Sequence, residues 1–110
     1  MVDNEFKNKV VLITGASRGI GKAIATAYSK FGSKVIANYN KSKEDALELV
    51  KNLTSEGYHI EAIQADVSKS KEAERMVDEV IKKYNHIDIL INNAGTNEAG
   101  QTMTKSSPPA

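Results

Sequence analysis

Three glycines within seven residues form the first candidate binding site in the sequence. Residues 14–21 read TGASRGIG, so Gly15, Gly19 and Gly21 follow the pattern G-x3-G-x-G. A buried-type apolar run, residues 10–13, comes directly before them, and a helical period follows directly after. At such a turn the first backbone N–H groups of the helix have no intrahelical partner and carry a partial positive charge. The spacing therefore predicts a site for a phosphate or pyrophosphate group.

Each glycine of this turn has its own expected role. Gly15 permits the tight turn, Gly19 lets the backbone approach the phosphates, and Gly21 lets the helix pack closely on the sheet. Arg18 lies in the same turn, where its guanidinium group can pair with a phosphate through two parallel hydrogen bonds. The turn is therefore expected to bind an anionic, phosphate-bearing ligand.

A glycine turn between a strand and a helix is typical of sites for dinucleotides. The end of the second apolar run indicates which dinucleotide this turn would favour. A site selective for NAD holds the adenosine ribose with an acid about twenty residues beyond the glycine turn. Here residues 38–42 read NYNKS, and the first acid is Glu44. Without a carboxylate to repel it, a 2′-phosphate is admitted, and Asn38 or Ser42 could add neutral donors. We therefore expect NADP(H) as the cofactor, with NAD(H) as the less favoured alternative.

These residues need strands and helices to position them, and the apolar periodicity supplies both. Strands are expected at residues 10–13, 34–38, 59–64 and 87–92, and helices over the amphipathic stretches 20–31, 42–53 and 73–84. Ser42 is expected to cap the second helix, and Ile20, Ile24, Tyr28 and Phe31 to form the buried face of the first. The β-α-β-α-β-α-β order predicts a Rossmann-type, doubly wound parallel α/β sheet with strand order 3-2-1-4, incomplete at this length.

Two further segments complete a resemblance to a known family. Residues 14–21, then Asp66 with Val67, then residues 92–95 (NNAG), resemble the three ordered signatures of the short-chain dehydrogenase/reductase family. Residues 7–95 are similar to the cofactor-binding half of 3-oxoacyl-acyl-carrier-protein reductases. The resemblance implies a carbonyl reductase that transfers a hydride from a nicotinamide dinucleotide.

The resemblance also implies roles for single residues. Asp66 would accept a hydrogen bond from the adenine amino group, and Val67 would supply a backbone donor to the ring. Taken alone, the Asp66 segment reads as a helix cap. Asn92 would brace the sheet beside the cofactor. The residues expected along the pyrophosphate and the two riboses are Gly15, Ser17, Arg18, Ile20, Asn93 and Gly95.

The catalytic groups of this family are expected outside the sequence. The family uses a tyrosine and a lysine four residues apart on a later helix, with a serine upstream. Tyr39 and Lys43 have that spacing, but they follow the second strand at the adenosine end and are rejected as catalytic. The chain is therefore expected to bind NADP(H) without turnover on its own. The alternatives are a non-catalytic NADP(H)-binding or regulatory module and a remnant that binds nothing.

Composition excludes several other classes of function. The 110 residues carry 15 lysines and arginines against 14 acids, a net charge of +1, so neither nucleic acid nor an anionic membrane is expected as a partner. The absence of cysteine removes disulfides and thiolate metal sites. We expect a cytoplasmic protein with no metal site, with His59 and His86 at turns or on the surface. Lys41, Lys43 and Lys51 are expected on a solvated helix face.

The expected organisation is one half-domain with a tail. Residues 1–95 are expected to form the dinucleotide-binding unit, and residues 96–110 a polar, disordered tail that resembles a truncation, a frameshifted end or a cut chain. In the 3-2-1-4 order the fourth strand lies at an apolar edge of the sheet. We therefore expect the isolated chain to be partly molten or to self-associate through that edge.

Overall fold

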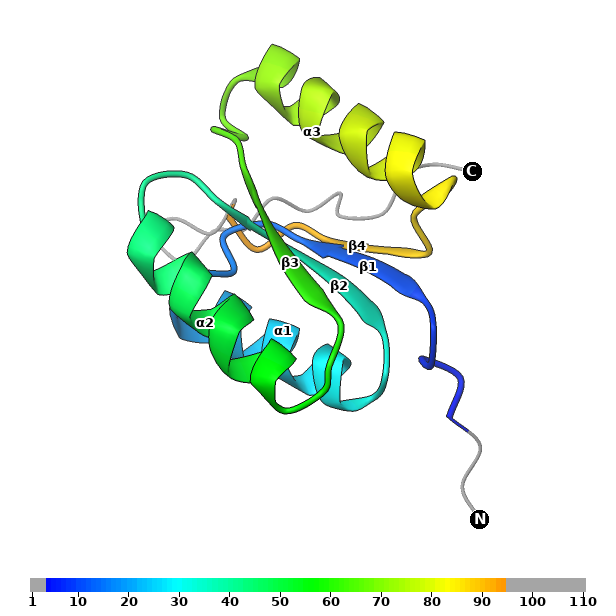
Figure 1. Cartoon of the computed structure of the whole chain (residues 1–110). Helices are drawn as coiled ribbons and strands as arrows, with labels where there is room; N and C mark the ends of the chain where they lie inside the picture. The colour runs from blue at the N-terminus through cyan, green and yellow to red at the C-terminus, as the bar shows by residue number, and fades with distance from the viewer. Residues whose placement is uncertain (1–3, 95–110) are drawn as a thin grey trace.

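The apolar run Val10–Ile13 forms β1, one of the two inner strands of a parallel sheet, in the computed structural model, which describes residues 4–94 (Figure 1). The sheet has the order β3-β2-β1-β4, and every pair is parallel. This confirms the predicted Rossmann-type fold. The elements are β1 (Val10–Ile13), α1 (Gly19–Lys30), β2 (Lys34–Tyr39), α2 (Lys43–Ser55), β3 (Ile60–Gln64), α3 (Ser70–Tyr84) and β4 (Ile89–Ile91).

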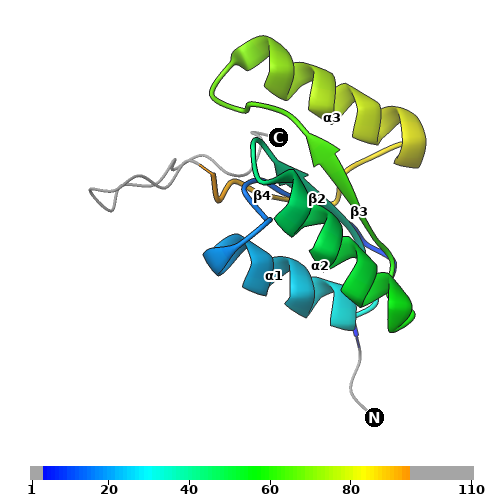
Figure 2. The ribbon, with the colours of Figure 1, turned by 60° about the vertical axis from the view of Figure 1, so that its left-hand side comes forward.

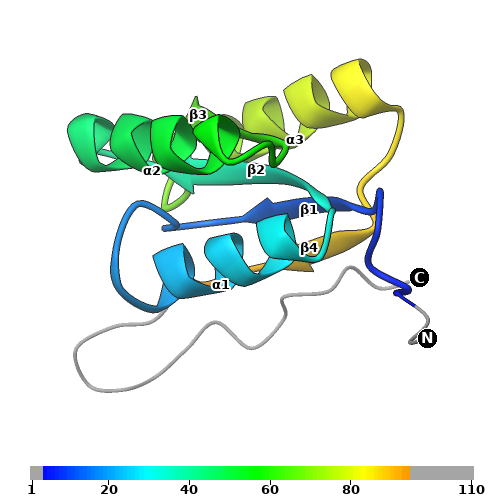
Figure 3. The ribbon, with the colours of Figure 1, turned by 60° about the horizontal axis from the view of Figure 1, so that its bottom comes forward.

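Strand β1 is apolar at every position because both of its faces are covered. Val11 and Ile13 belong to a core cluster with residues of α1 and α2, whereas Val10 and Leu12 belong to a second cluster with residues of α3. Figures 1 and 2 show α1 and α2 on one side of the sheet and α3 on the other. Figure 3 shows the sheet with β2, β1 and β4 one after another and the axis of α1 running along them. The two layers of helices fix β1 between them.

The buried face of helix α1 is shorter than the periodicity predicted. Ile24 and Tyr28 pack against the core, but Ile20 is 70% exposed and Phe31 is 45% exposed. Ile20 lies in the first turn, which belongs to the glycine turn and not to the sheet face. Phe31 lies past the last helical residue and stacks on Phe6 at a ring distance of 5.3 Å. The expectation that both lie in the core is therefore wrong.

Element ends also differ from the sequence expectations. Strand β4 spans only Ile89–Ile91, and Asp88 directly before it still contacts β1: its N–H donates to the Val10 oxygen at 2.9 Å, and its carboxylate accepts from the Val10 N–H at 2.8 Å. Ser42 stands at the N-cap of α2, but its side chain makes no capping hydrogen bond. The expected tail at residues 96–110, together with Gly95, lies outside the described residues. No helix within residues 4–94 has the length and apolar character needed to cross a membrane.

A polar cluster links β3 to α3. Lys83 Nζ lies 2.9 Å from Glu61 Oε2, the Tyr84 hydroxyl donates to the same carboxylate, and His59 Nε2 lies 3.0 Å from the Tyr84 oxygen. Burial acts to raise the pKa of Glu61, but the hydrogen bonds from Tyr84 and Lys83 outweigh it and hold that pKa below its ordinary value. Burial, and then the Glu61 carboxylate, raise the pKa of Tyr84. The cluster therefore favours an ionised Glu61 beside a neutral Tyr84.

This cluster predicts a specific loss of stability in acid. Because the pKa of Glu61 is lower in the folded chain, its contribution is complete above the ordinary value of 4.5 and is lost as the pH falls through the folded-state value. We expect the thermal midpoint of Glu61→Gln to fall less than that of the parent between about pH 6 and pH 3. The exposed Glu48→Gln on α2 should keep the parent's dependence. Parallel curves for the parent and Glu61→Gln would contradict the assignment.

Candidate functional site

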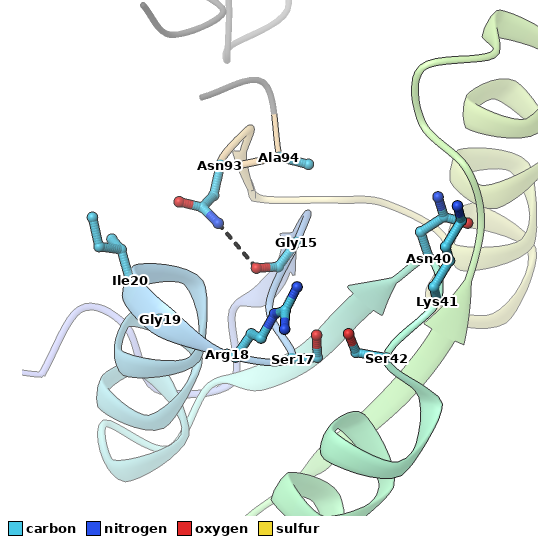
Figure 4. Close-up of a pocket in the computed structure, with 10 residues that line it drawn as sticks. All are labelled: Gly15, Ser17, Arg18, Gly19, Ile20, Asn40, Lys41, Ser42, Asn93 and Ala94. Carbon is cyan, nitrogen blue, oxygen red and sulfur yellow. Dashed lines mark hydrogen bonds between the residues drawn. The ribbon is translucent and has the colours of Figure 1, made fainter. Parts of the chain in front are cut away.

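A pocket of about 680 Å³ opens where the glycine turn meets the ends of β2 and β4 (Figure 4). This volume falls in the range of small-molecule and cofactor sites. The four strands within residues 4–94 are parallel, and the pocket lies beyond their carboxyl ends, where open α/β sheets bind ligands. The residues that line it are Gly15, Ser17, Arg18, Gly19, Ile20, Asn40, Lys41, Ser42, Asn93 and Ala94.

The glycine turn places the start of α1 at this pocket. Gly15 and Gly19 have φ angles of +61° and +63°, in the left-handed region that side chains disfavour. Arg18 is the N-cap residue of α1 and makes no side-chain cap hydrogen bond. The first turn of α1 contains no acid, whereas that of α2 carries Glu44 and Asp45 and that of α3 carries Glu72. Among the helices that the structure describes, α1 thus has the N-terminus best suited to an anion.

Glycine is required at position 21 by a contact with the glycine turn, whereas a contact with the sheet was expected. A Cβ atom at Gly21 would lie 2.2 Å from the backbone oxygen of Gly15 and 2.6 Å from Asn93 Nδ2. The helix therefore packs on the turn and on Asn93, and the tightest contact is not with a strand. Asn93 Nδ2 also donates to the Gly15 oxygen at 3.0 Å (Figure 4). Any side chain at position 21 would push these groups apart.

Thr14 joins the glycine turn to the segment after β4. Its hydroxyl donates to Asn92 Oδ1 at 3.2 Å and accepts from the Ala94 N–H at 2.9 Å. Its backbone N–H donates to the Ile91 oxygen at 3.0 Å. Residues 92–94 are thereby held against the turn, and Asn93 and Ala94 form the second wall of the pocket.

The charges around the pocket are all of one sign. Arg18 and Lys41 are the charged residues among the lining, and no acid belongs to it within residues 4–94. Figure 4 shows the Arg18 guanidinium group directed into the hollow. The expectation that Lys41 lies on a helix is wrong, because it lies in the loop after β2, at the pocket, before α2 begins. Its exposure to solvent agrees with the expectation. Its position two residues past the strand, opposite the glycine turn, was the signal that sequence reasoning missed.

Asn38 is the clearest correction among the expected ligand contacts. Its side chain is 1% exposed and does not line the pocket. Its Oδ1 accepts from the Gly15 N–H at 3.1 Å, and its Nδ2 faces the oxygens of Ile63 and Ala65 at 3.3 and 3.2 Å. Both amide groups are thus engaged inside the protein. The expected donor to a phosphate is absent at Asn38, whereas Ser42 does line the pocket.

Asp66 and Val67 follow β3 at the same edge of the sheet, but neither lines this pocket. Asp66 Oδ1 accepts from the backbone N–H and the hydroxyl of Ser68 at 3.1 and 2.6 Å. These two bonds lower the pKa of Asp66. Val67 packs against the core cluster beneath α3. The structure therefore gathers the expected residues at positions 15, 17–20 and 93, sets Gly21 and Asn38 behind them, and leaves Asp66 and Val67 apart.

The sequence matches the family model described as "short chain dehydrogenase" over residues 9–108. It is 42% identical over 88 residues to a hydroxynaphthalene reductase-like protein of Metarhizium guizhouense, covering 80% of this chain and 33% of that relative. It is 48% identical over 87 residues to a short-chain dehydrogenase/reductase of Pestalotiopsis microspora, covering 79% and 33%. The chain thus spans about a third of the length of these curated relatives.

Solved structures show the same architecture. A short-chain dehydrogenase from Burkholderia cenocepacia in complex with NADP superposes with a TM-score of 0.77 at 40% identity, covering 82% of this chain and 37% of the other. A blue fluorescent protein from a metagenomic library in complex with NADPH superposes with a TM-score of 0.76 at 35% identity, covering 82% and 37%.

The contact at Gly21 predicts an inverted effect of alanine. Alanine normally stabilises a helix by about 0.5–1 kcal/mol relative to glycine. Here we expect Gly21→Ala to lower the free energy of unfolding by about 1–3 kcal/mol, because the added methyl group overlaps the Gly15 carbonyl. Urea unfolding measures this, with Ala23→Gly on the exposed side of α1 as the control for helix propensity. A more stable Gly21→Ala chain would show that the turn moves aside freely.

Proposed function

The chain belongs to the short-chain dehydrogenase family, and from that premise we propose that it forms the NADP(H)-binding part of an oxidoreductase that reduces a carbonyl group. One observation carries the cofactor assignment. The pocket at the glycine turn combines the start of α1 with Arg18 and Lys41 and contains no acid within the described lining. A dinucleotide with an additional phosphate matches this set of groups.

Different residues of the pocket are proposed to bind different parts of the cofactor. We assign the pyrophosphate to the backbone N–H groups at the start of α1, beside Gly19 and Ile20. We assign the 2′-phosphate to Arg18 and Lys41, with the Ser42 hydroxyl nearby. When bound, the reduced nicotinamide supplies the hydride for the carbonyl carbon.

The remaining expected contacts stay proposals. Asn93 lines the pocket on the side of β4, where we place the second ribose. Gly95, expected to share this contact, lies outside the described residues. The adenine ring is assigned to Asp66 and Val67, which follow β3. The Asp66 carboxylate has a second oxygen besides the one that Ser68 occupies, and that oxygen can accept from the adenine amino group.

For the substrate we propose a carbonyl of the 3-oxoacyl type. The resemblance of the three sequence signatures supports this, and a relative named as a reductase of the hydroxynaphthalene type is consistent with carbonyl reduction. Tyr39 is not among the lining residues, so we assign it no proton transfer. We propose that residues 4–94 bind the cofactor, and we assign proton donation to none of them.

Cofactor preference tests this proposal. We expect the chain to bind NADPH at least about tenfold more tightly than NADH, a difference of about 1.4 kcal/mol, measured by titration calorimetry. Arg18→Ala should remove most of the difference, and Lys41→Ala should remove part of it. Lys51→Ala, an exposed charge on α2 away from the pocket, serves as the control and should leave the ratio unchanged. Equal affinities of the parent chain for the two cofactors would overturn the assignment.

We also propose that a second copy of this chain associates through β4. Within residues 4–94, β4 pairs with β1 and has no strand on its other side. An apolar strand at a sheet edge offers unpaired backbone groups to another chain. We expect light scattering to show concentration-dependent association, and hydrogen exchange at Ile89, Leu90 and Ile91 to slow as the concentration rises. A monodisperse monomer whose β4 amides are as protected as those of β1 would contradict this proposal.

A further inference from the structure

One buried polar side chain lies behind the pocket and joins the glycine turn to the end of β3. Asn38, in β2, accepts from the Gly15 N–H through Oδ1 at 3.1 Å, and its backbone oxygen accepts from the Ala16 N–H at 2.8 Å. Gly15 has a left-handed backbone, and Ala16 leads into the residues that line the pocket. Asn38 therefore holds two consecutive amides of the glycine turn.

The other end of the same side chain holds β3. Nδ2 lies 3.3 Å from the Ile63 oxygen and 3.2 Å from the Ala65 oxygen, and Ala65 directly precedes Asp66. Only an amide offers one acceptor toward an N–H and two donors toward carbonyls in this small space. A rotated amide would set Nδ2 against the Gly15 N–H and Oδ1 against the carbonyl oxygens. The surroundings therefore require both the residue type and its orientation.

We propose that Asn38 is a positioning residue that sets the glycine turn and the end of β3 at a fixed separation. The inference rests on the proposed function, because those two segments carry the pyrophosphate and adenine assignments. The Gly15 N–H is used inside the protein and is not a ligand donor. The donors for the cofactor therefore come from the residues after Ala16, and Asn38 acts on them only through the turn.

The first test compares Asn38→Leu with the parent chain. Leucine has a similar size but removes the acceptor for Gly15 and both donors for β3. We expect NADPH to bind at least about tenfold more weakly, under conditions where circular dichroism shows that both chains are folded. A general loss of stability would leave the affinity of the folded chain unchanged. Asn52→Leu, at an exposed position of α2, is the control and should bind as the parent does. Unchanged NADPH binding by Asn38→Leu would overturn the inference.

Amide exchange provides a readout that needs no cofactor. In the parent chain we expect slow exchange at Gly15, whereas in Asn38→Leu this amide should exchange rapidly while Val11, Leu12 and Ile13 stay protected. Equal protection of Gly15 in both chains would overturn the inference. If the parent fails to bind NADPH, the proposed function fails, and this exchange experiment still decides whether Asn38 holds the turn.

A second variant covers the case in which Asn38→Leu does not fold. Asn38→Asp keeps an acceptor for the Gly15 N–H but loses both donors toward β3. We expect Gly15 to remain slow in exchange, and the amides of Asp66 and Val67 to exchange faster than in the parent. Rapid exchange at Gly15 in Asn38→Asp would overturn the inference, because the acceptor would not then be what holds the turn.

Discussion

The close contact between α1 and the glycine turn is the constraint on which the pocket depends. A side chain at Gly21 would overlap the Gly15 carbonyl, so the helix can approach the turn this closely only with glycine there. The same carbonyl accepts from Asn93, which brings the segment after β4 into the contact. One backbone oxygen thus fixes the helix, the turn and the second wall relative to one another. This arrangement supports the charged and hydroxyl side chains that line the pocket.

Most of the fold could be predicted, because a strand that is buried on both faces of a sheet is a continuous apolar run in the sequence. The apolar runs and helical periods predict the β-α-β-α-β-α-β sequence of elements, and right-handed crossovers of a Rossmann-type fold then predict the order 3-2-1-4 that the structure has. Element ends were less predictable. Asp88 accepts from the Val10 N–H with its side chain directly before β4, and Ile20 follows the helical period yet lies at the pocket. Both effects come from tertiary contacts that periodicity does not contain.

The site was predicted in part, for a related reason. The glycine turn is a local feature, since a strand, three glycines and a helix follow one another along the chain. The end of β2 and the loop after it are different. Successive side chains of a strand point to opposite faces, so a small error exchanges their roles, and Asn38 of β2 was expected at the ligand although it is buried. Lys41 was expected on a helix, although it lies in the loop after β2 and lines the pocket. The distance along the sequence from the glycine turn predicts which segment lies at the ligand. Only the three-dimensional structure shows which side chains of that segment face the pocket.

The bond from Asn93 to Gly15 joins residues that are 78 positions apart, and those from Thr14 to Asn92 and from Ala94 to Thr14 span 78 and 80. Contacts of such long range carry a cost in loop-closure entropy that local contacts do not. The two walls of the pocket therefore stay together only while the sheet and the helices between them in the sequence are folded. A ligand that bridges the walls binds the folded chain and not its partly folded forms, and it therefore shifts the folding equilibrium as a whole.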